Sequence, residues 1–284
     1  GAQKIILEKA LSVCIDLPDT DFEMVHLAGA WGRERQIKSQ KLEVGAISIG
    51  SIRGASSAEH NPFIALKRPY TTENQGEVYG FSFVYSGNFM GKVEVSPHEI
   101  TRVVMGIHPY NFVWPLKKGE SFQTPEVVMV YSDKGLNEMS QTFHKLYSSR
   151  LVRGVWRDRE RPILINNWEA TYFDFDEKKI LSIAAKAKEA GVELFVLDDG
   201  WYGERNNDDR SLGDWYPNMK KLPNGIAGLS RKVEKLGLKF GLWIEPEMTN
   251  KNSDLYRAHP DWILSTPERY ESMCRSQHIL DYSR

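Results

Sequence analysis

The sequence has 284 residues, of which 41% are hydrophobic and 26% charged, and its formal net charge is −1. This balance is typical of a globular chain long enough for two domains. A charge so near zero gives no electrostatic reason to expect nucleic acid or a membrane surface as a partner. No stretch approaches the ~18 apolar residues of a membrane span, and the first residues lack the order of a signal peptide.

Residues 1–133 show the period-two alternation of β-strands. Within 78–96, aromatic residues alternate with smaller ones, a glycine–asparagine turn follows, and the alternation then resumes. The runs 101–107 and 125–132 are further strand-like segments bounded by proline or glycine. Several strands with turns between them predict an antiparallel β-sandwich.

Residues 134–150 change to helical spacing, because apolar residues recur every three or four positions. The apolar face consists of Leu136, Met139, Phe143, Leu146 and Tyr147. We expect this helix to link two halves of the chain. We therefore assign 1–153 to a sandwich domain that includes the helix, and 154–284 to a second domain.

The second half alternates strands with helices. Helices are predicted at 177–190 and 226–236, with Asp176 as an N-cap and Gly191 and Gly237 after the helix ends. The strands are 162–166, 192–198 and 238–244. Continuous apolar strands separated by helices predict a parallel sheet.

Acidic and aromatic residues follow all three of these strands. The first strand runs into Asn-Asn-Trp-Glu (166–169), the second into Asp-Asp-Gly-Trp (198–201) and the third into Glu-Pro-Glu (245–247). Parallel β/α structures bind ligands at the carboxyl ends of their strands. Carboxylates accept hydrogen bonds from hydroxyls and an indole face packs on the C–H face of a sugar ring, so a sugar site is expected there.

Each of these residues also has a purely structural interpretation. Asp198 and Asp199 could serve as a helix cap and a turn residue, although adjacent acids at a strand end are costly without a ligand. Trp243 lies within an apolar strand and could belong to the core. The other residues open to a structural reading are Glu245 and Glu247 as solvated or ion-paired acids, Trp201 and Trp215 as loop packing, Arg275 as a surface residue, and His60 as a solvated loop residue.

Cysteine and histidine usage gives no metal signature. Cys14 and Cys274 lie far apart, which argues against a disulfide framework and favours a reducing, cytoplasmic compartment. Two thiols cannot form a thiolate zinc site, and the histidines include neither HxH nor HExxH spacing.

Beyond these patterns, the sequence resembles glycoside hydrolase family 36, the bacterial α-galactosidases. The motifs in the second half are NNWEATYFDF (166–175), LDDGWYG (197–203), LGDWYPNMKKLPNG (212–225), FGLWIEPEM (240–248) and LYRAHPDW (255–262). Those resembling the family's N-terminal β-supersandwich are HLAGAWGRERQIK (26–38), RGASSAEHNPFIAL (53–66) and GEVYGFSFVYSGNF (76–89). They occur in the family's order along nearly the whole chain.

The resemblance implies a multidomain fold, an antiparallel β-sandwich (supersandwich) followed by a partial (β/α)8 TIM barrel. It implies retaining hydrolysis of terminal α-1,6-linked galactose from oligosaccharides such as melibiose and raffinose. Members of the family form homotetramers in which a sandwich loop of one subunit reaches the pocket of another. The polar loop 53–62 is the candidate here for such a contact.

Site residues follow from the same resemblance, position by position. Asp198 and Asp199 are similar to the paired aspartates that hold the O4 and O6 hydroxyls of galactose. Trp168 is similar to a tryptophan lining the pocket, and Trp243 to one near the C6 end of the sugar. Arg275 is similar to an arginine that reaches the sugar. The resemblance implies no metal or organic cofactor.

One part of the family pattern is missing. The family's nucleophile lies in a Lys-(Trp/Tyr)-Asp-Met-Asn-Arg run, and its acid/base follows a Cys-Ser-Gly-Gly-Gly-Arg run. Neither run occurs in this sequence. A retaining glycosidase needs two carboxyl groups ~5–5.5 Å apart. We therefore expect the chain to be an internal fragment of the enzyme and inactive by itself.

Three other functions remain open from the sequence. The first is a non-catalytic galactose-binding module. The second is a barrel enzyme that binds Mg²⁺ through Asp198, Asp199, Glu245 and Glu247. The third is a transferase similar to raffinose synthase, which would use the same pocket with a sugar acceptor in place of water.

Overall fold

The computed structural model describes residues 4–269, 271 and 273–283. The chain forms two compact units, Gly1–Arg157 and Asp158–Arg284, and each is described by itself. Among the described residues, no helix has the length and apolar character needed to cross a membrane.

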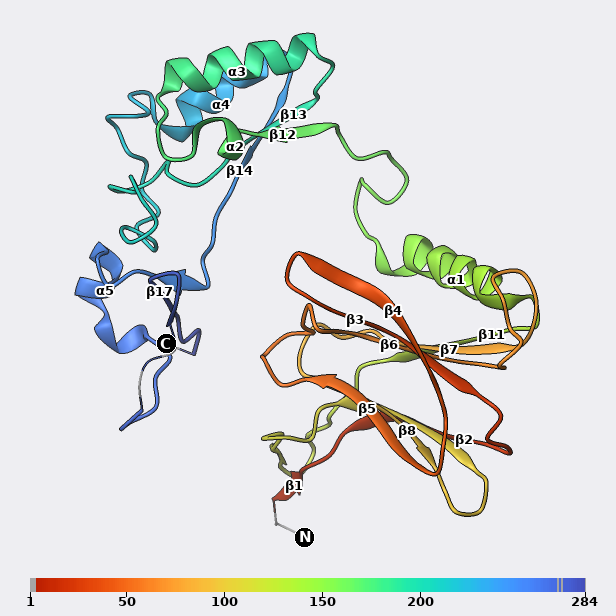
Figure 1. Ribbon diagram of the computed structural model, residues 1–284. Coiled ribbons are helices and arrows are strands. Elements are labelled where there is room, and N and C mark those ends of the chain that lie inside the picture. Colours follow the sequence, from red (N-terminus) through yellow and green to blue (C-terminus); the bar gives the residue numbers. More distant parts are fainter. Residues whose placement is uncertain (1–3, 270, 272, 284) are drawn as a thin grey trace. The chain divides into compact units, whose positions relative to one another are not determined.

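The first unit contains two antiparallel sheets (Figure 1). One sheet consists of β3 (Glu23–Ala30), β4 (Arg33–Lys41), β6 (His60–Lys67), β7 (Val78–Phe83) and β11 (Val127–Ser132), in the order β11-β7-β6-β3-β4. The other consists of β2 (Leu11–Leu17), β5 (Gly45–Ser51), β8 (Phe89–Val95) and β9 (Thr101–Ile107), in the order β2-β9-β8-β5. A separate ribbon pairs β1 (Ile5–Leu7) with β10 (Trp114–Leu116).

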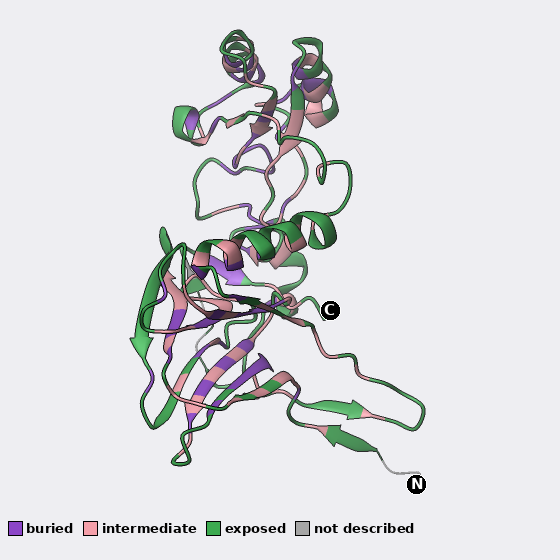
Figure 2. Ribbon diagram, turned by 90° about the vertical axis from the view of Figure 1, so that its right-hand side faces the viewer, coloured by how far each residue is buried: buried purple, intermediate pink, exposed green. Residues whose placement is uncertain are grey.

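The inner faces of the two sheets share one apolar core, which confirms the sandwich prediction. Met24, Ile64 and Phe81 from the five-stranded sheet pack with Phe89 and Met105 from the other. Figure 2 shows buried residues along the strands of both sheets. Alternation along each strand places its apolar residues on this inner face.

The two alternating runs within 78–96 belong to different sheets, because β7 pairs with β6 and β11 whereas β8 pairs with β5 and β9. The turn between them carries the chain from one sheet to the other. Alternation predicts strands but not their partners, since a strand in either sheet has the same period.

The predicted helix 134–150 forms α1 (Gly135–Leu146), followed by a π-helical turn, Tyr147–Leu151. Met139 and Phe143 bury the expected apolar face against the outer side of the five-stranded sheet. Gly80 allows this close approach, because a Cβ there would lie 2.6 Å from Phe143 and 2.7 Å from Met139. The packing therefore explains why β7 has glycine at this position.

The second unit contains a three-stranded parallel sheet, as predicted. Its strands are β12 (Leu164–Asn166), β13 (Leu194–Leu197) and β14 (Lys239–Leu242), in that order. The helices between them are α2 (Trp168–Thr171), α3 (Glu177–Glu189) and α4 (Gly225–Lys235). Asp176 caps α3 by accepting a bond from the Lys179 amide at 2.8 Å, and Gly191 and Gly237 follow the helices with φ of 87° and 81°.

Helices α3 and α4 lie over the sheet (Figure 1), and their apolar side chains form the core of this unit with those of the strands. Ile180 and Val233 are fully buried against Phe195 and Leu197 of β13. This packing fixes the strands side by side, so their carboxyl ends open into the same group of loops.

The remainder of the second unit is a small antiparallel sheet that the sequence did not predict. Its strands are β15 (Met248–Thr249), β16 (Met273–Cys274) and β17 (Gln277–Ile279), in the order β15-β17-β16. Between β15 and β16 lie α5 (Asp254–Ala258) and a 3-10 turn, Pro260–Trp262. Strands of two or three residues are too short to show a period.

Candidate functional site

Asp198 directly follows β13, and its carboxylate is half-buried. Asn166 Nδ2 donates to Asp198 Oδ2 at 2.7 Å, and the Asp199 amide donates to Asp198 Oδ1 at 2.7 Å. Burial raises the pKa of Asp198, and the neighbouring Asp199 charge adds to this rise. Each oxygen accepts one of these two bonds, so the carboxylate retains capacity to accept hydroxyl hydrogens.

The two asparagines at the end of β12 align this strand end with β13. Asn167 Oδ1 accepts the amide hydrogen of Asp198 at 2.9 Å, and Asn166 Oδ1 accepts that of Trp168 at 3.1 Å. Asn166 therefore connects Asp198 to Trp168, two residues that the sequence analysis predicted for the site. The sequence showed both asparagines but offered no reason to assign them this role.

Asp199 has a different environment from its neighbour. Its side chain is 8% exposed and faces the Arg205 guanidinium, with Nε 3.0 Å from Oδ1 and Nη2 2.9 Å from Oδ2. Tyr202 also donates its hydroxyl to Oδ1 at 2.8 Å. Internal donors therefore occupy both oxygens of this carboxylate.

Arg205 is fully buried although it lies in the polar segment ERNNDDR. Besides Asp199, its Nη1 donates to the Arg210 carbonyl at 2.9 Å and to Asn250 Oδ1 at 3.0 Å. A buried guanidinium must be paired and hydrogen-bonded to be tolerated. Sequence reasoning missed Arg205, because an arginine among polar loop residues has the signature of a solvated side chain.

The two predicted tryptophans lie on different strand ends. Trp168 begins α2, is half-buried, and contacts the rings of Tyr172 and Phe173 edge-on at 5.1 Å. Trp243 follows β14, and its carbonyl accepts the indole N–H of Trp201 at 2.9 Å. Within the described part of the chain, the rings of Trp168 and Trp243 do not contact each other.

The end of the third strand brings a further carboxylate to the site. Glu245 is half-buried and accepts a bond from Gln277 Nε2 at 3.1 Å. Burial raises the pKa of Glu245, the Glu247 and Asp199 charges raise it further, and the Arg275 charge opposes the rise. The sequence left the role of Glu245 open, and the structure places its carboxylate at this strand end with Gln277 as a hydrogen-bond partner.

The loops that follow β12, β13 and β14 are called the rim of the site. Lys221 connects loops of this rim through hydrogen bonds. Its Nζ donates to the carbonyls of Phe173 and Gly200 at 2.9 Å and of Arg205 at 3.2 Å. These three bonds use the full donor capacity of an ammonium group. Burial lowers the pKa of Lys221, and the Asp199 charge opposes that effect.

The arrangement suits a neutral, hydroxyl-rich ligand. Asp198 and Glu245 offer half-buried acceptors, Arg275 offers donors, and the tryptophans offer apolar faces. A divalent cation fits poorly, because the Asp199 oxygens face the Arg205 guanidinium. Among residues 4–269, 271 and 273–283, no three acidic, histidine or cysteine side chains are placed to hold a metal ion.

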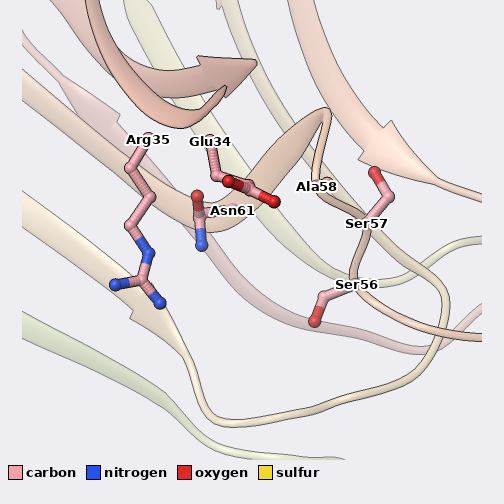
Figure 3. A pocket seen from close by; sticks show the side chains of 6 residues that line it. All are labelled: Glu34, Arg35, Ser56, Ser57, Ala58 and Asn61. Atoms are coloured by element: carbon pink, nitrogen blue, oxygen red, sulfur yellow. The ribbon is translucent and has the colours of Figure 1, made fainter. Parts of the chain in front are cut away.

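The first unit has a polar hollow of about 510 Å³ beside loop 53–62, the candidate for a subunit contact. It is lined by Glu34, Arg35, Ser56, Ser57, Ala58 and Asn61 (Figure 3). Figure 3 shows the Glu34 side chain from β4 extending toward the side of the loop that carries the serines, whereas Arg35 extends away from them and Asn61 lies between the two in this view. His60, which the sequence left open, is half-buried beside His26, with ring centroids 5.7 Å apart.

Sequence comparison relates both units to one group of enzymes. The profile of the family named Melibiase matches residues 121–284, and that of the glycosyl hydrolase family 36 N-terminal domain matches residues 1–117. Alpha-galactosidase AgaA of Geobacillus stearothermophilus is 61% identical over 284 residues. Alpha-galactosidase 1 of Pediococcus pentosaceus is 47% identical over 284 residues. Both alignments cover 100% of this chain and 39% of the relative.

Structural comparison gives the same result. A crystal structure of an AgaA variant from Geobacillus stearothermophilus in complex with raffinose matches with a TM-score of 0.96 and 60% sequence identity. The match covers 100% of this chain and 40% of that one. This chain therefore spans about two fifths of the length of the proteins that it resembles.

Proposed function

Since the chain belongs to the melibiase family, the family 36 glycosyl hydrolases, we propose that the protein carrying it is an α-galactosidase. It hydrolyses terminal α-1,6-linked galactose from oligosaccharides of the melibiose and raffinose type, with retention of configuration. What supports the proposal most is that 61% identity with an α-galactosidase extends over the whole chain. The half-buried acceptors at the strand ends fit the same substrate.

The role proposed for this chain is to bind the sugar. This sequence contains neither of the two runs that carry the nucleophile and the acid/base in the family. Asp198, Trp168, Trp243 and Arg275 form the binding surface, with β12, β13 and β14 as the first strands of a (β/α)8 barrel. In such barrels, residues at the carboxyl ends of the strands contact the substrate.

Within this surface the two aspartates contribute unequally. Asp198 has free acceptor capacity and accepts hydroxyl hydrogens of galactose directly. Asp199 has little to offer, since Arg205 and Tyr202 occupy its oxygens. These bonds leave the carboxylate room for about one further bond to a sugar hydroxyl, and its main part is to anchor the loop beside Asp198.

The test is hydrolysis by the full-length protein. It is offered 4-nitrophenyl α-galactoside, the matching α-glucoside, and raffinose. The proposal expects release of galactose from raffinose, initial formation of the α-anomer by NMR, and much slower turnover of the glucoside. Equal turnover of both glycosides would contradict it, and a product larger than raffinose would indicate transfer to a sugar acceptor.

We also propose that the protein is a homotetramer in which the hollow beside loop 53–62 contacts another subunit. The hollow is polar and lined from two elements, and Trp31 at the tip of the adjoining β3–β4 hairpin is 90% exposed. Tryptophan is enriched at protein–protein interfaces, so an indole in this position fits a subunit contact. Light scattering of the full-length protein tests this, and a monomer with full activity would contradict it.

A cytoplasmic location is the last part of the proposal. It is supported by the cysteine usage, since Cys14 is an exposed free thiol. Reducing compartments keep such thiols reduced. Detection of the full-length protein outside the cells that make it would contradict this location.

A further inference from the structure

Asn250 directly follows β15 and is fully buried. Its Oδ1 accepts from Arg205 Nη1 at 3.0 Å and from the Leu212 amide at 2.9 Å. Its Nδ2 donates to the Ser276 carbonyl at 2.8 Å and to the Asp208 carbonyl at 3.3 Å. A primary amide has two acceptor sites and two donors, so all four are in use.

On its acceptor side, Asn250 is linked through Arg205 to the two aspartates that follow β13. Arg205 holds both Asn250 and the Asp199 carboxylate, and the Asp199 amide is bonded to Asp198. Arg205 and Asn250 are both fully buried. The position of Asn250 is thereby fixed relative to the end of β13.

On its donor side, Asn250 holds the turn that carries Arg275. This two-residue turn joins β16 to β17, and Arg275 and Ser276 have φ of 53° and 61°. Turns with two left-handed residues normally use asparagine and glycine. For other residues this backbone is strained and persists only where surrounding contacts hold it. The bond from Asn250 to the Ser276 carbonyl is such a contact.

We propose that Asn250 is a positioning residue of the sugar site, which ties the strained Arg275 turn to the Arg205–Asp199 pair. The inference rests on the proposed function. Asn250 is too deeply buried to touch substrate, and its effect passes through the placement of Arg275. Displacing a binding group by about 1 Å is sufficient to weaken its contribution severely.

The experiment replaces Asn250 with aspartate in the full-length protein. Asn250→Asp keeps an acceptor for Arg205 and the Leu212 amide, but loses the donor to the Ser276 carbonyl and the longer bond to the Asp208 carbonyl. The expected result is a KM for 4-nitrophenyl α-galactoside raised roughly tenfold with kcat changed less than about twofold. Asn252→Asp is the matched control, since Asn252 is exposed and its oxygen remains, and it should leave both constants unchanged.

A double-mutant cycle separates positioning from a general structural role. In an Arg275→Ala background, Asn250→Asp should raise KM no further, because its effect acts through Arg275. Additive effects of the two changes would overturn the proposal. Ser276→Gly should restore much of the lost affinity of Asn250→Asp, since glycine adopts the turn without strain. Failure of this rescue would also count against it.

Two further outcomes are distinguishable. If the unsubstituted protein does not hydrolyse the galactoside, the proposed function fails. If it does, and Asn250→Asp behaves as the unsubstituted protein, only the positioning role fails. Should Asn250→Asp not fold, Asn250→Ser, which lacks the amide donor and carries no charge, takes its place in the same cycle.

Discussion

Two arginine–aspartate pairs, one in each unit, have the same forked geometry and different surroundings. In the sandwich, Arg102 donates to both oxygens of Asp16 at 2.7 and 2.8 Å, and the two side chains are 52% and 45% exposed. In the second unit, Arg205 donates to both oxygens of Asp199 at 3.0 and 2.9 Å, and the two side chains are 0% and 8% exposed. The chemical groups are the same, so burial is what separates the two pairs.

The surroundings determine what each pair does. Arg102 and Asp16 are cross-strand neighbours on β9 and β2, which backbone bonds already hold together. Arg205 connects segments far apart in sequence, since its guanidinium also bonds to Asn250. An exposed ion pair adds little stability to two strands that backbone hydrogen bonds already join. A buried ion pair instead fixes loops that lack such backbone bonds. Precise placement of a binding rim thus depends on buried polar groups.

The largest expected effect comes from Arg205→Met. It leaves the Asp199 carboxylate buried with Tyr202 as its remaining side-chain donor, and breaking a buried pair in this way costs about 3–5 kcal/mol. Urea unfolding of the chain, followed by tryptophan fluorescence, should show a markedly lower midpoint for the second unit.

Arg102→Met is the matched control for this change, because it removes an equivalent fork from the surface. Its unfolding midpoint should stay within experimental error of the unsubstituted chain. Equal shifts for the two variants would remove the distinction between the pairs and with it the argument from burial.

A smaller effect is expected for Lys221→Met, which keeps the aliphatic stem and removes three donated bonds. Carbonyls left without a partner in partly buried surroundings cost about 1–3 kcal/mol in total. Hydrogen exchange should show faster opening around Phe173 and Gly200, whose carbonyls Lys221 binds. Lys220→Met, at an exposed neighbour, should show no change; similar opening in both variants would contradict the role of Lys221.

The contributions of Asp16 and Asp198 to the pH dependence of stability should differ in sign. The bond from Arg102 lowers the pKa of Asp16, so its stabilising effect is present above the unfolded pKa of about 3.9 and is lost as pH falls through the folded value. Burial raises the pKa of Asp198, so the folded state loses stability as pH rises from that unfolded value past the folded one.

Substitution by asparagine tests these opposite signs. Asp198→Asn should be more stable than the unsubstituted chain at pH 7, and the difference should disappear below about pH 4. Asp16→Asn should be slightly less stable at pH 7. Unfolding curves at a series of pH values provide the measurement, and a destabilised Asp198→Asn at pH 7 would show that burial of its charge is not costly.

Local patterns predicted most of the fold. Strand alternation in 101–107 and 125–132 and the helix starting at Asp176 correspond to β9, β11 and α3, because period and capping are properties of neighbouring residues. The pairing of β7 and β8 with different sheets was not predicted, since partners depend on contacts distant in sequence. The short strands β16 and β17 carried no periodic signal.

The candidate site was predictable to a similar degree. The rule that ligands bind at strand ends placed Asp198 and Trp168 on one rim, where the structure has them. Arg205 and Asn250 could not be found in the same way. Each is an ordinary polar residue in a loop, and they become a buried pair only because the fold brings together positions 45 residues apart.

The most direct test of the account is kinetic comparison of Asp198→Asn with Asp261→Asn in the full-length protein. Asp261 is exposed outside the rim. If Asp198 binds galactose hydroxyls through its charged carboxylate, Asp198→Asn should lower kcat/KM for the α-galactoside by about 2–4 kcal/mol of transition-state stabilisation, roughly 30- to 1,000-fold. Asp261→Asn should leave kcat/KM unchanged. Unchanged kcat/KM in a folded Asp198→Asn variant would contradict the account.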